Sequence, residues 1–586
     1  MHRFSAKWQT KHNGAIAQLV EQRTENPCVT GSIPVGTTKT RVTKSVTLVF
    51  VCLLYLVTQF FSSSIPWFLN QESVRCLRGV LLFPWGIYKS NLVEIDKSAI
   101  INLVEIDKTA ILNLVEIDKT AILNLVESKN ICTFVADYQT ETMIYFKRKL
   151  YDTMLAWKKE RHGDTALLIQ GARRIGKSTI AEEFARKEYK SYILIDFSNV
   201  SQEVSDLFKD ISDLNYLFLR LQFIFQVQLY ERDSVIIFDE VQLQPLARQA
   251  IKHLVKDHRY DYIETGSLIS VHLQSRNIVI PSEETKLNMY PMDYEEFRWA
   301  LGDTATIPLL RTAFEKKMSL GDAVHRKLMR DFRLYMLVGG MPQAVATYIQ
   351  TNNFSSVDVV KRDIIALYEE DFGKIDDSGR AKAMYDAIPA QLSRNFSRYQ
   401  VNKAIPNERV ERIAHVIKDL EDSMTTNIAF HSDDPNVGLA LTKNDEYFKM
   451  YTSDTGLFVT LAFKDQDITE NVIYDKLLND KLSANLGYVY ENVIAQMLRA
   501  AGKNLFYHTI PYAEGKKFYE TDFVIVDKHK ISPIEVKSSG YKTHKSLDVF
   551  CEKYADRILN KYIIYTKDLK RENGIDYIPV YMTMFL

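Results

Sequence analysis

The chain has 586 residues, of which 46% are hydrophobic, and its 74 basic and 74 acidic side chains leave no formal net charge. This composition is typical of globular proteins and the length predicts three or four domains, which excludes disordered and collagen-like architectures. Zero net charge also argues against a protein that coats polyanions, so any contact with nucleic acid must be local.

Residues 1–142 differ from the rest of the chain, and we expect most of them to be a non-native extension. The stretch 14–36 reads as the D-arm and then the T-arm of a translated tRNA gene. An eleven-residue unit that begins NLVEIDK recurs over 91–128. Such a period fits a right-handed coiled coil, but packing would constrain only the apolar positions, and here the polar positions repeat as well. We therefore predict young DNA repeats and a functional start at Met143, where an amphipathic helix begins.

An apolar run over 46–61 follows Lys39, Arg41 and Lys44. It is short for a membrane span, which needs about 20 apolar residues, and T-rich intergenic DNA yields similar runs. We favour the second explanation and expect no membrane partner. Cys551 is the single cysteine after residue 140, and no cysteine has metal-ligand spacing. The sequence therefore predicts a protein of a reducing compartment, the cytoplasm, without structural zinc.

A nucleotide site is predicted after residue 163. An apolar strand pattern over 164–170 is followed by the loop GARRIGKST and then by a helical pattern. This is the GxxxxGK[ST] spacing in its strand, loop and helix context, which makes a chance glycine-rich turn improbable. The residues predicted to bind ATP are Gly171, Ala172, Arg173, Arg174, Ile175, Gly176, Lys177, Ser178 and Thr179.

Each loop residue type suits phosphate chemistry. Gly171 and Gly176 let the backbone N–H groups turn toward phosphate oxygens, and the helix N-terminus adds a favourable dipole. Lys177 would neutralise the β- and γ-phosphates during catalysis, and Ser178 would offer its hydroxyl to Mg²⁺. The sequence does not decide whether Arg173 and Arg174 face phosphate, a partner subunit or solvent.

A second strand pattern covers Ser191 to Phe197 and is followed by a helical pattern over 206–230. The next strand pattern begins at Ser234 and ends in two carboxylates, Asp239 and Glu240. Asp239 is placed to hold Mg²⁺ through water and Glu240 to polarise the attacking water. Without the upstream loop, both would more simply end a strand or cap a helix. The next strand ends near Thr265 and Ser267, which suit either a γ-phosphate sensor or a turn.

The segments VIIFDEVQ, ETGSLIS, IPSEE, YPMDYEEF and YMLVGGMPQAV resemble the bacterial and archaeal P-loop ATPases of the AAA superclass that carry a C-terminal DUF4143 domain. The resemblance runs from about Met143 to the C-terminus. It implies an α/β protein with an ATPase core over 143–300, a helical lid over 301–375, a winged-helix-like segment over 376–460 and a nuclease-like domain over 461–586.

The middle of the chain is helical in pattern. Helices predicted between Arg311 and Tyr368 are interrupted at Gly339 to Pro342, and a turn is expected at Asp376. Two helices, the second beginning at Arg409, and a strand over 381–430 fit a winged helix, either one that enters a DNA groove or one that only packs. We favour packing because the segment lacks a dense basic face.

The last domain carries a pattern of two carboxylates and a lysine. Strands predicted over 519–526 and 531–538 form a hairpin, and alternate residues share a face, so Asp522 would meet Glu535 and Lys537. Adjacent carboxylates repel unless a cation joins them, which predicts Mg²⁺ or Mn²⁺. Lys537 would be catalytic by orienting water or stabilising phosphate charge. Glu491 is a further candidate metal ligand.

This D…ExK pattern resembles the PD-(D/E)xK nuclease core, with Thr521 at the usual proline. Both an active nuclease and a salt-bridged remnant fit it. Nearby, Lys542, His544 and Lys545 suit either phosphate contacts or a solvated turn.

These features predict a cytoplasmic ATPase that uses ATP and Mg²⁺ to control a C-terminal domain that binds or cuts nucleic acid. DNA and a second copy of the chain are the candidate partners. One alternative is a nucleotide-dependent switch whose nuclease-like domain only binds protein. The other is a membrane-anchored ATPase that uses the apolar run over 46–61.

Overall fold

The computed structural model describes residues 145–267, 281–394, 396–465, 474, 478, 487–512 and 517–586. The chain divides into two compact units, Met1–Val135 and Ala136–Leu586, and every described residue lies in the second. The tRNA-like stretch, the apolar run, the repeats and Met143 all fall outside the described residues. In the ranges that are described, no helix is long and apolar enough to cross a membrane.

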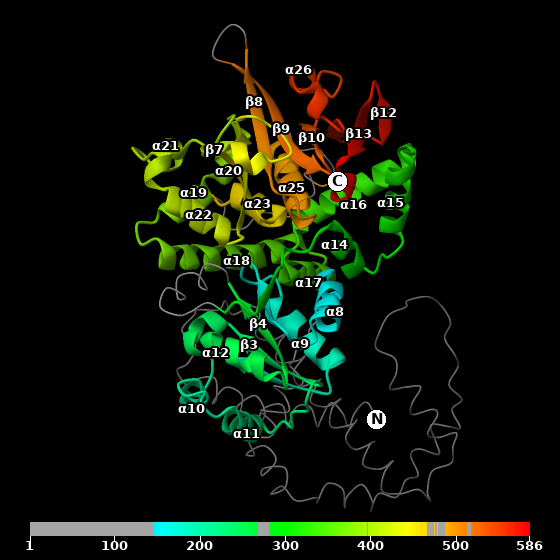
Figure 1. Cartoon of the computed structure of the whole chain (residues 1–586). Helices are drawn as coiled ribbons and strands as arrows, with labels where there is room; N and C mark the ends of the chain where they lie inside the picture. The colour runs from blue at the N-terminus through cyan, green and yellow to red at the C-terminus, as the bar shows by residue number, and fades with distance from the viewer. Residues whose placement is uncertain are drawn as a thin grey trace, which may run out of the picture. The chain divides into compact units, whose positions relative to one another are not determined.

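A five-stranded parallel sheet forms the first part of this unit (Figure 1), with strand order β2-β3-β4-β1-β5. The four strands predicted from apolar runs are confirmed, with ends that differ by up to two residues, and β5 is an addition that the sequence did not indicate. The strands are β1 (Ala166–Gln170), β2 (Ser191–Asp196), β3 (Ser234–Asp239), β4 (Asp261–Gly266) and β5 (Glu284–Asn288).

Helices cover both faces of this sheet because its side chains alternate between two cores. Leu167 and Ile169 pack in one core with α8 and α9, whereas Ala166 and Leu168 pack in the other with α10, α11 and α12. A short 3-10 helix, η1, joins β3 to α12. These helices are α8 (Leu150–Arg161), α9 (Lys177–Glu188), α10 (Gln202–Leu207), α11 (Leu214–Phe225), η1 (Val241–Leu243) and α12 (Pro245–Asp257).

Two predicted helices have different bounds in the structure. The helix expected from Met143 begins only at Leu150. The single helix expected over 206–230 is two, α10 and α11, because Asp213 caps the second one by accepting a hydrogen bond from the Tyr216 N–H at 3.1 Å. Asp side chains compete for backbone N–H groups in this way and so begin helices where a periodic pattern alone suggests continuity.

The middle of the chain is helical as predicted, and its break at Gly339 is confirmed. Gly339 has a φ of 85°, in the left-handed region, and a Cβ on Gly340 would lie 2.1 Å from the Met292 carbonyl oxygen. Only glycine permits both features. The helices are α14 (Tyr294–Ala300), α15 (Thr306–Lys316), α16 (Asp322–Val338), α17 (Pro342–Thr351) and α18 (Phe354–Ile375).

The next segment begins with the predicted turn, in which Asp376 accepts hydrogen bonds from the backbone of Ser378 and Ala381. The helix expected from Arg409 is a 3-10 turn followed by a shorter helix. The elements are α19 (Arg380–Asp386), α20 (Ile388–Ser393), α21 (Val401–Ala404), η3 (Val410–Arg412), α22 (Ala414–Asp422), β6 (Thr426–Ser432), η4 (Leu439–Thr442), β7 (Lys443–Thr452) and α23 (Thr455–Ala462).

Strands β6 and β7 belong to an eight-stranded mixed sheet with order β12-β13-β11-β10-β9-β8-β6-β7. The boundary that we placed after residue 460 therefore falls between strands of one sheet. The remaining elements are α25 (Gly487–Ala500), β8 (Phe506–Pro511), β9 (Phe518–Asp527), β10 (Lys530–Lys537), α26 (Lys545–Lys553), η5 (Ala555–Arg557), β11 (Tyr562–Tyr565), β12 (Lys570–Glu572), β13 (Ile575–Pro579) and η6 (Val580–Phe585).

One hydrophobic core runs from α8 and one face of the parallel sheet, through the helical middle, to the C-terminal sheet and η6. Polar contacts also join the helical middle to the elements that follow it. The His325 ring contacts the Tyr581 hydroxyl at 2.9 Å, and Lys361 Nζ donates to the carbonyl oxygen of Leu337 at 2.8 Å and to that of Gly456 at 3.2 Å. The parallel sheet, the helices and the mixed sheet therefore pack as one body.

Candidate functional site

The loop from Gly171 to Gly176 joins β1 to α9 at the carboxyl end of the parallel sheet. Gly176 has a φ of 93° and directly precedes α9, so the chain turns sharply into the helix N-terminus. A Cβ on Gly171 would lie 2.4 Å from the Met289 carbonyl oxygen, which leaves room only for glycine. The loop and helix thus have the geometry that presents backbone N–H groups to an anion.

Lys177, the first residue of α9, is buried inside this loop. Its Nζ donates hydrogen bonds to the carbonyl oxygens of Gly171 at 3.1 Å and Ala172 at 2.8 Å. Burial lowers the pKa of Lys177, while Glu240 and Asp239 oppose that shift. The loop's own carbonyl groups therefore hold the ammonium where the sequence predicts phosphate.

Ser178 and Asp239 lie together, as expected of two groups that share a magnesium ion. Ser178 Oγ donates to Asp239 Oδ1 at 2.7 Å. The hydroxyl of Thr265, at the end of the neighbouring strand β4, also donates to Asp239 Oδ1. The Ser178 hydroxyl at the start of α9 and the Asp239 carboxylate at the end of β3 are ligands that suit Mg²⁺, directly or through water. Thr265 thus lies beside Asp239, and its role as a sensor of the γ-phosphate stays a prediction.

Glu240 follows Asp239 with a φ of 50°, a left-handed conformation that is uncommon outside glycine and often marks functional sites. Its backbone N–H contacts Thr265 Oγ1 at 3.4 Å, and its carboxylate accepts a hydrogen bond from the side chain of Gln242. The other polar atom of that amide, Gln242 Oε1, is buried without a partner among the described residues. Sequence reasoning did not find Gln242.

The remaining loop residues have different surroundings. Ala172 and Ile175 are buried, Arg174 has a φ of 66°, and Thr179 lies in the first turn of α9. Arg173 reaches away from the loop to Asp371 of α18, with Nη1 3.2 Å from Oδ1. The sequence did not decide what Arg173 faces. In this structure its side chain forms an ion pair with the helical middle of the chain.

Arg148 is a loop contact that no sequence pattern indicated. This buried side chain donates to the Ile175 carbonyl oxygen at 2.9 Å and to the Tyr290 carbonyl oxygen at 2.6 Å. Its Nε also lies 3.0 Å from Oε2 of the buried Glu296. Arg148 thus connects the segment before α8 to the phosphate-loop backbone and to the start of α14. Because its partners are 27 to 148 residues away, local spacing carries no sign of the contact.

The predicted C-terminal hairpin is confirmed. Strands β9 and β10 are antiparallel, with Phe523 opposite Ile534. Asp522 Oδ2 accepts a hydrogen bond from the Val536 N–H at 2.7 Å, and Lys537 Nζ lies 2.8 Å from Glu535 Oε1. Glu535 Oε2 is buried without a partner in the described structure. The three residues of the D…ExK pattern therefore meet at one place.

Glu491 lies in α25 and is paired with other side chains. It accepts hydrogen bonds from Lys449 Nζ at 2.9 Å and from the Tyr451 hydroxyl at 2.7 Å. Lys449 also contacts Glu520. Lys449 and Tyr451 lie in β7, more than 65 residues before the hairpin, so sequence spacing could not reveal them. We call the six residues Lys449, Glu491, Glu520, Asp522, Glu535 and Lys537 the carboxylate cluster.

Four carboxylates and two ammonium groups give this cluster an excess of negative charge. Burial, followed by the nearby Glu535 and Glu491 carboxylates, raises the pKa of Asp522 well above its usual range. Burial also raises the pKa of Glu535, against the opposing effect of Lys537. The unpartnered Glu535 oxygen and the raised pKa values suit a cation, yet no three His, Cys, Asp or Glu residues in the described ranges are arranged to hold a metal ion. The fit to Mg²⁺ therefore rests on Asp522 and Glu535 alone.

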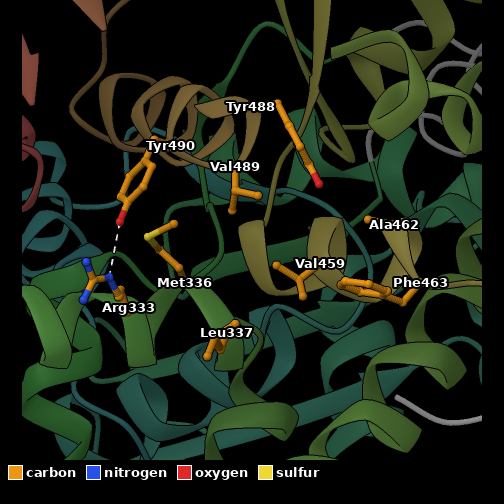
Figure 2. Close-up of a pocket in the computed structure, with 9 residues that line it drawn as sticks. All are labelled: Arg333, Met336, Leu337, Val459, Ala462, Phe463, Tyr488, Val489 and Tyr490. Atoms are coloured by element: carbon orange, nitrogen blue, oxygen red, sulfur yellow. Dashed lines mark hydrogen bonds between the residues drawn. The ribbon is translucent and has the colours of Figure 1, made fainter. Parts of the chain in front are cut away.

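Figure 2 shows a pocket between α16, α23 and α25 that contains none of the predicted site residues. Its walls are mostly apolar, and its polar groups contact each other, with Arg333 Nε 3.4 Å from the Tyr490 hydroxyl. The pocket is lined by Arg333, Met336, Leu337, Val459, Ala462, Phe463, Tyr488, Val489 and Tyr490.

Comparison with known families finds three matches along the chain. Residues 163–298 match an AAA domain, residues 329–467 match a domain of unknown function, DUF8612, and residues 486–583 match another, DUF4143. The DUF8612 match crosses the boundary that we expected at residue 375. No curated protein matches the sequence.

Solved structures resemble the chain only weakly. The RuvB Holliday junction branch migration motor of Thermotoga maritima is 13% identical, with a TM-score of 0.22, over 47% of this chain and 82% of that one. A signal transduction ATPase with a tetratricopeptide repeat sensor from Pyrococcus horikoshii is 9% identical, with a TM-score of 0.22, over 61% and 46%. TM-scores this low support no inference about function.

The family matches and the fold together establish the class of the protein. It is an α/β protein with a P-loop ATPase domain of the AAA type, a helical middle and a mixed C-terminal sheet. An AAA domain implies binding and hydrolysis of ATP with Mg²⁺, and the function of the DUF4143 domain is unknown.

Proposed function

We propose that this protein is a cytoplasmic, Mg²⁺-dependent ATPase that controls a C-terminal domain acting on nucleic acid. The observation that carries the ATPase half is the meeting of Lys177, Ser178, Asp239 and Glu240 at the carboxyl ends of β1 and β3. The nucleic-acid half is supported by the D…ExK residues, which converge on the β9–β10 hairpin.

In this proposal, each residue of the nucleotide site has one task. Lys177 exchanges its loop carbonyl partners for the β- and γ-phosphate oxygens, and Ser178 with Asp239 holds Mg²⁺. Bound Mg²⁺ supplies charge neutralisation at the phosphates. Glu240 orients the attacking water, and Gln242 fixes the Glu240 carboxylate.

In the C-terminal domain, Asp522 and Glu535 would hold a divalent cation beside Lys537. The cation would neutralise their adjacent charges, which burial otherwise makes costly. Lys537 would then stabilise the charge that develops on a phosphate.

The test of this function uses the full chain and two assays. The wild-type protein should hydrolyse ATP. Lys177→Ala should lose hydrolysis and bind ATP more weakly, whereas Glu240→Gln should lose hydrolysis but still bind ATP. The exposed Glu231→Gln is a matched control. Incubation with linear and circular DNA, Mg²⁺ or Mn²⁺, with and without ATP, should give cleavage that Lys537→Ala abolishes. Turnover that survives Glu240→Gln would show that another residue orients the water.

A second candidate function has its own support. Lys449 already neutralises Glu491 and Glu520, and the described residues contain no three-ligand metal site. These observations favour a nucleotide-dependent switch in which the C-terminal domain binds another protein, or a second copy of the chain, without cutting DNA. Intact ATP hydrolysis with no DNA cleavage under any condition would favour this function.

A further inference from the structure

The ribbon of β8 and β9 projects from the C-terminal sheet (Figure 1). Its ladder continues beyond β8, because the Tyr512 N–H donates to the Lys517 carbonyl oxygen at 3.0 Å. Three aromatic residues gather at this end of the ribbon. We call Tyr512, Lys517, Phe518 and Tyr519 together the aromatic arm.

The rings of the arm lie on both of its faces. Tyr512 and Tyr519 stack with ring centroids 4.0 Å apart, and the ammonium group of Lys545 lies 5.5 Å from the Tyr519 centroid. Phe518 points to the opposite face, since neighbouring residues in a strand alternate, and half of its surface is exposed. A large aromatic ring that remains this exposed on an extended ribbon offers a flat apolar surface to a partner.

The exposed ring shares a face with the carboxylate cluster. Phe518 and Glu520 alternate along β9 and so point the same way, and Glu520 contacts Lys449 of the cluster. Phe518 and Asp522 are four residues apart, which corresponds to about 13 Å along a strand. That length equals about four nucleotides at the stacked spacing of one strand.

The charge around the arm identifies the kind of partner. Lys517 is exposed next to Phe518, and Lys545 is exposed beside Tyr519 on the other face. Lysines beside exposed rings are the combination that binds single-stranded nucleic acid, because each base stacks through its π-face while the backbone needs cations. The faces of bases in a duplex are already covered by their neighbours, so a duplex cannot use the Phe518 ring in this way.

We infer that the aromatic arm binds single-stranded nucleic acid, with a base stacked on Phe518 and the backbone leading along β9 to the carboxylate cluster. This inference rests on the proposed nucleic-acid function and specifies its substrate as single-stranded. In this proposal the aromatic arm binds the strand, and the carboxylate cluster is the place where the strand would react.

Binding is measured by fluorescence anisotropy of a labelled oligothymidylate with the full chain in EDTA, so that cleavage cannot interfere. Phe518→Ala should weaken binding roughly tenfold, the effect of losing one base stack, and Lys517→Ala should weaken it less and reduce its salt dependence. Phe223→Ala removes a ring from α11 in the ATPase domain that is even more exposed than Phe518, and it should have no effect. Thermal unfolding of each variant should match wild type because both rings are exposed.

The outcomes separate the arm from the cluster. Equal affinity of Phe518→Ala and wild type, or equal affinity for duplex and single strand, would overturn the inference even if cleavage is observed. A wild-type protein that binds no oligonucleotide would overturn it as well, and would favour a protein partner for the arm.

Discussion

Arg173 in the phosphate loop lies 3.2 Å from Asp371 in α18, and Tyr368 on the same helix donates to the Arg173 carbonyl oxygen at 3.1 Å. Nearer its N-terminus, α18 carries Lys361, which donates to the Gly456 carbonyl oxygen in α23 at 3.2 Å. One helix thus contacts both the loop expected to hold phosphate and the part of the chain that leads to the C-terminal sheet. A rearrangement of the loop would directly change the contacts that α18 makes with it.

Asp371→Asn should tighten ATP binding by a few-fold, because the Asp371 carboxylate and the phosphates would compete for Arg173. The pair is partly exposed, so its contribution is about 1 kcal/mol or less, which limits the change to about fivefold. Titration with a fluorescent ATP analogue measures the affinity. Asp377→Asn, at an exposed acid after the same helix, should leave affinity unchanged. Weaker binding in Asp371→Asn would contradict this competition.

Arg148→Met should destabilise the protein by about 3 to 5 kcal/mol, because it leaves the buried Glu296 without its arginine partner. It should also weaken ATP binding, since the Ile175 carbonyl oxygen in the loop loses its donor. Adding Glu296→Gln should restore part of the stability without restoring ATP affinity. Chemical unfolding and ATP titration measure the two effects. Recovery of both by the double variant would show that Arg148 acts only on stability.

Gly340→Ala should be strongly destabilising, because the added Cβ would lie 2.1 Å from the Met292 carbonyl oxygen, a backbone atom that cannot easily move. Gly373→Ala in α18 is the matched control. A Cβ there meets nothing within 4 Å, and alanine favours a helix over glycine by about 1 kcal/mol, so this change should be neutral or stabilising. The midpoint of thermal unfolding checks both variants, and equal midpoints would contradict the close approach of Gly340 to Met292.

Binding of Mg²⁺ or Mn²⁺ to the carboxylate cluster should release protons, because burial and neighbouring carboxylates raise the pKa of Asp522 and Glu535. Titration calorimetry in two buffers with different ionisation enthalpies counts the released protons. Asp522→Asn should abolish this signal, and Asp445→Asn at an exposed site should not. The absence of any binding heat in wild type would favour the switch over the nuclease.

Stability should fall as the pH decreases from about 6.5 to about 4, in part through His508. Burial lowers the pKa of His508 from its ordinary value of 6.5 to about 4 in the folded protein. In this window the unfolded chain binds a proton that the folded protein does not, so the free energy of unfolding decreases by up to about 3 kcal/mol. His508→Gln should flatten this slope in chemical unfolding, whereas the exposed His253→Gln should keep it.

The sequence predicts those features that depend on local order. The loop between β1 and α9, the carboxylates that end β3, the glycine break before α17 and the hairpin with Asp522 and Glu535 all follow from spacing and strand alternation. Arg148, Lys449 and Tyr451 were not predicted because their partners lie 27 to 148 residues away. The ion pair of Glu491 with Lys449 was missed for the same reason, since the pattern on α25 shows an acid but not the base in β7.

The continuous core from α8 to η6 has a practical consequence for anyone who dissects this protein into fragments. An ATPase fragment that stops after α14 would expose the apolar face that the helical middle covers. A C-terminal fragment would lose the contact of Tyr581 with His325 of α16 and the hydrogen bond that Lys361 of α18 donates to Gly456. Such fragments would aggregate or unfold for reasons unrelated to their activity. Chimaeras that exchange C-terminal domains should therefore move α15 to α18 together with the mixed sheet.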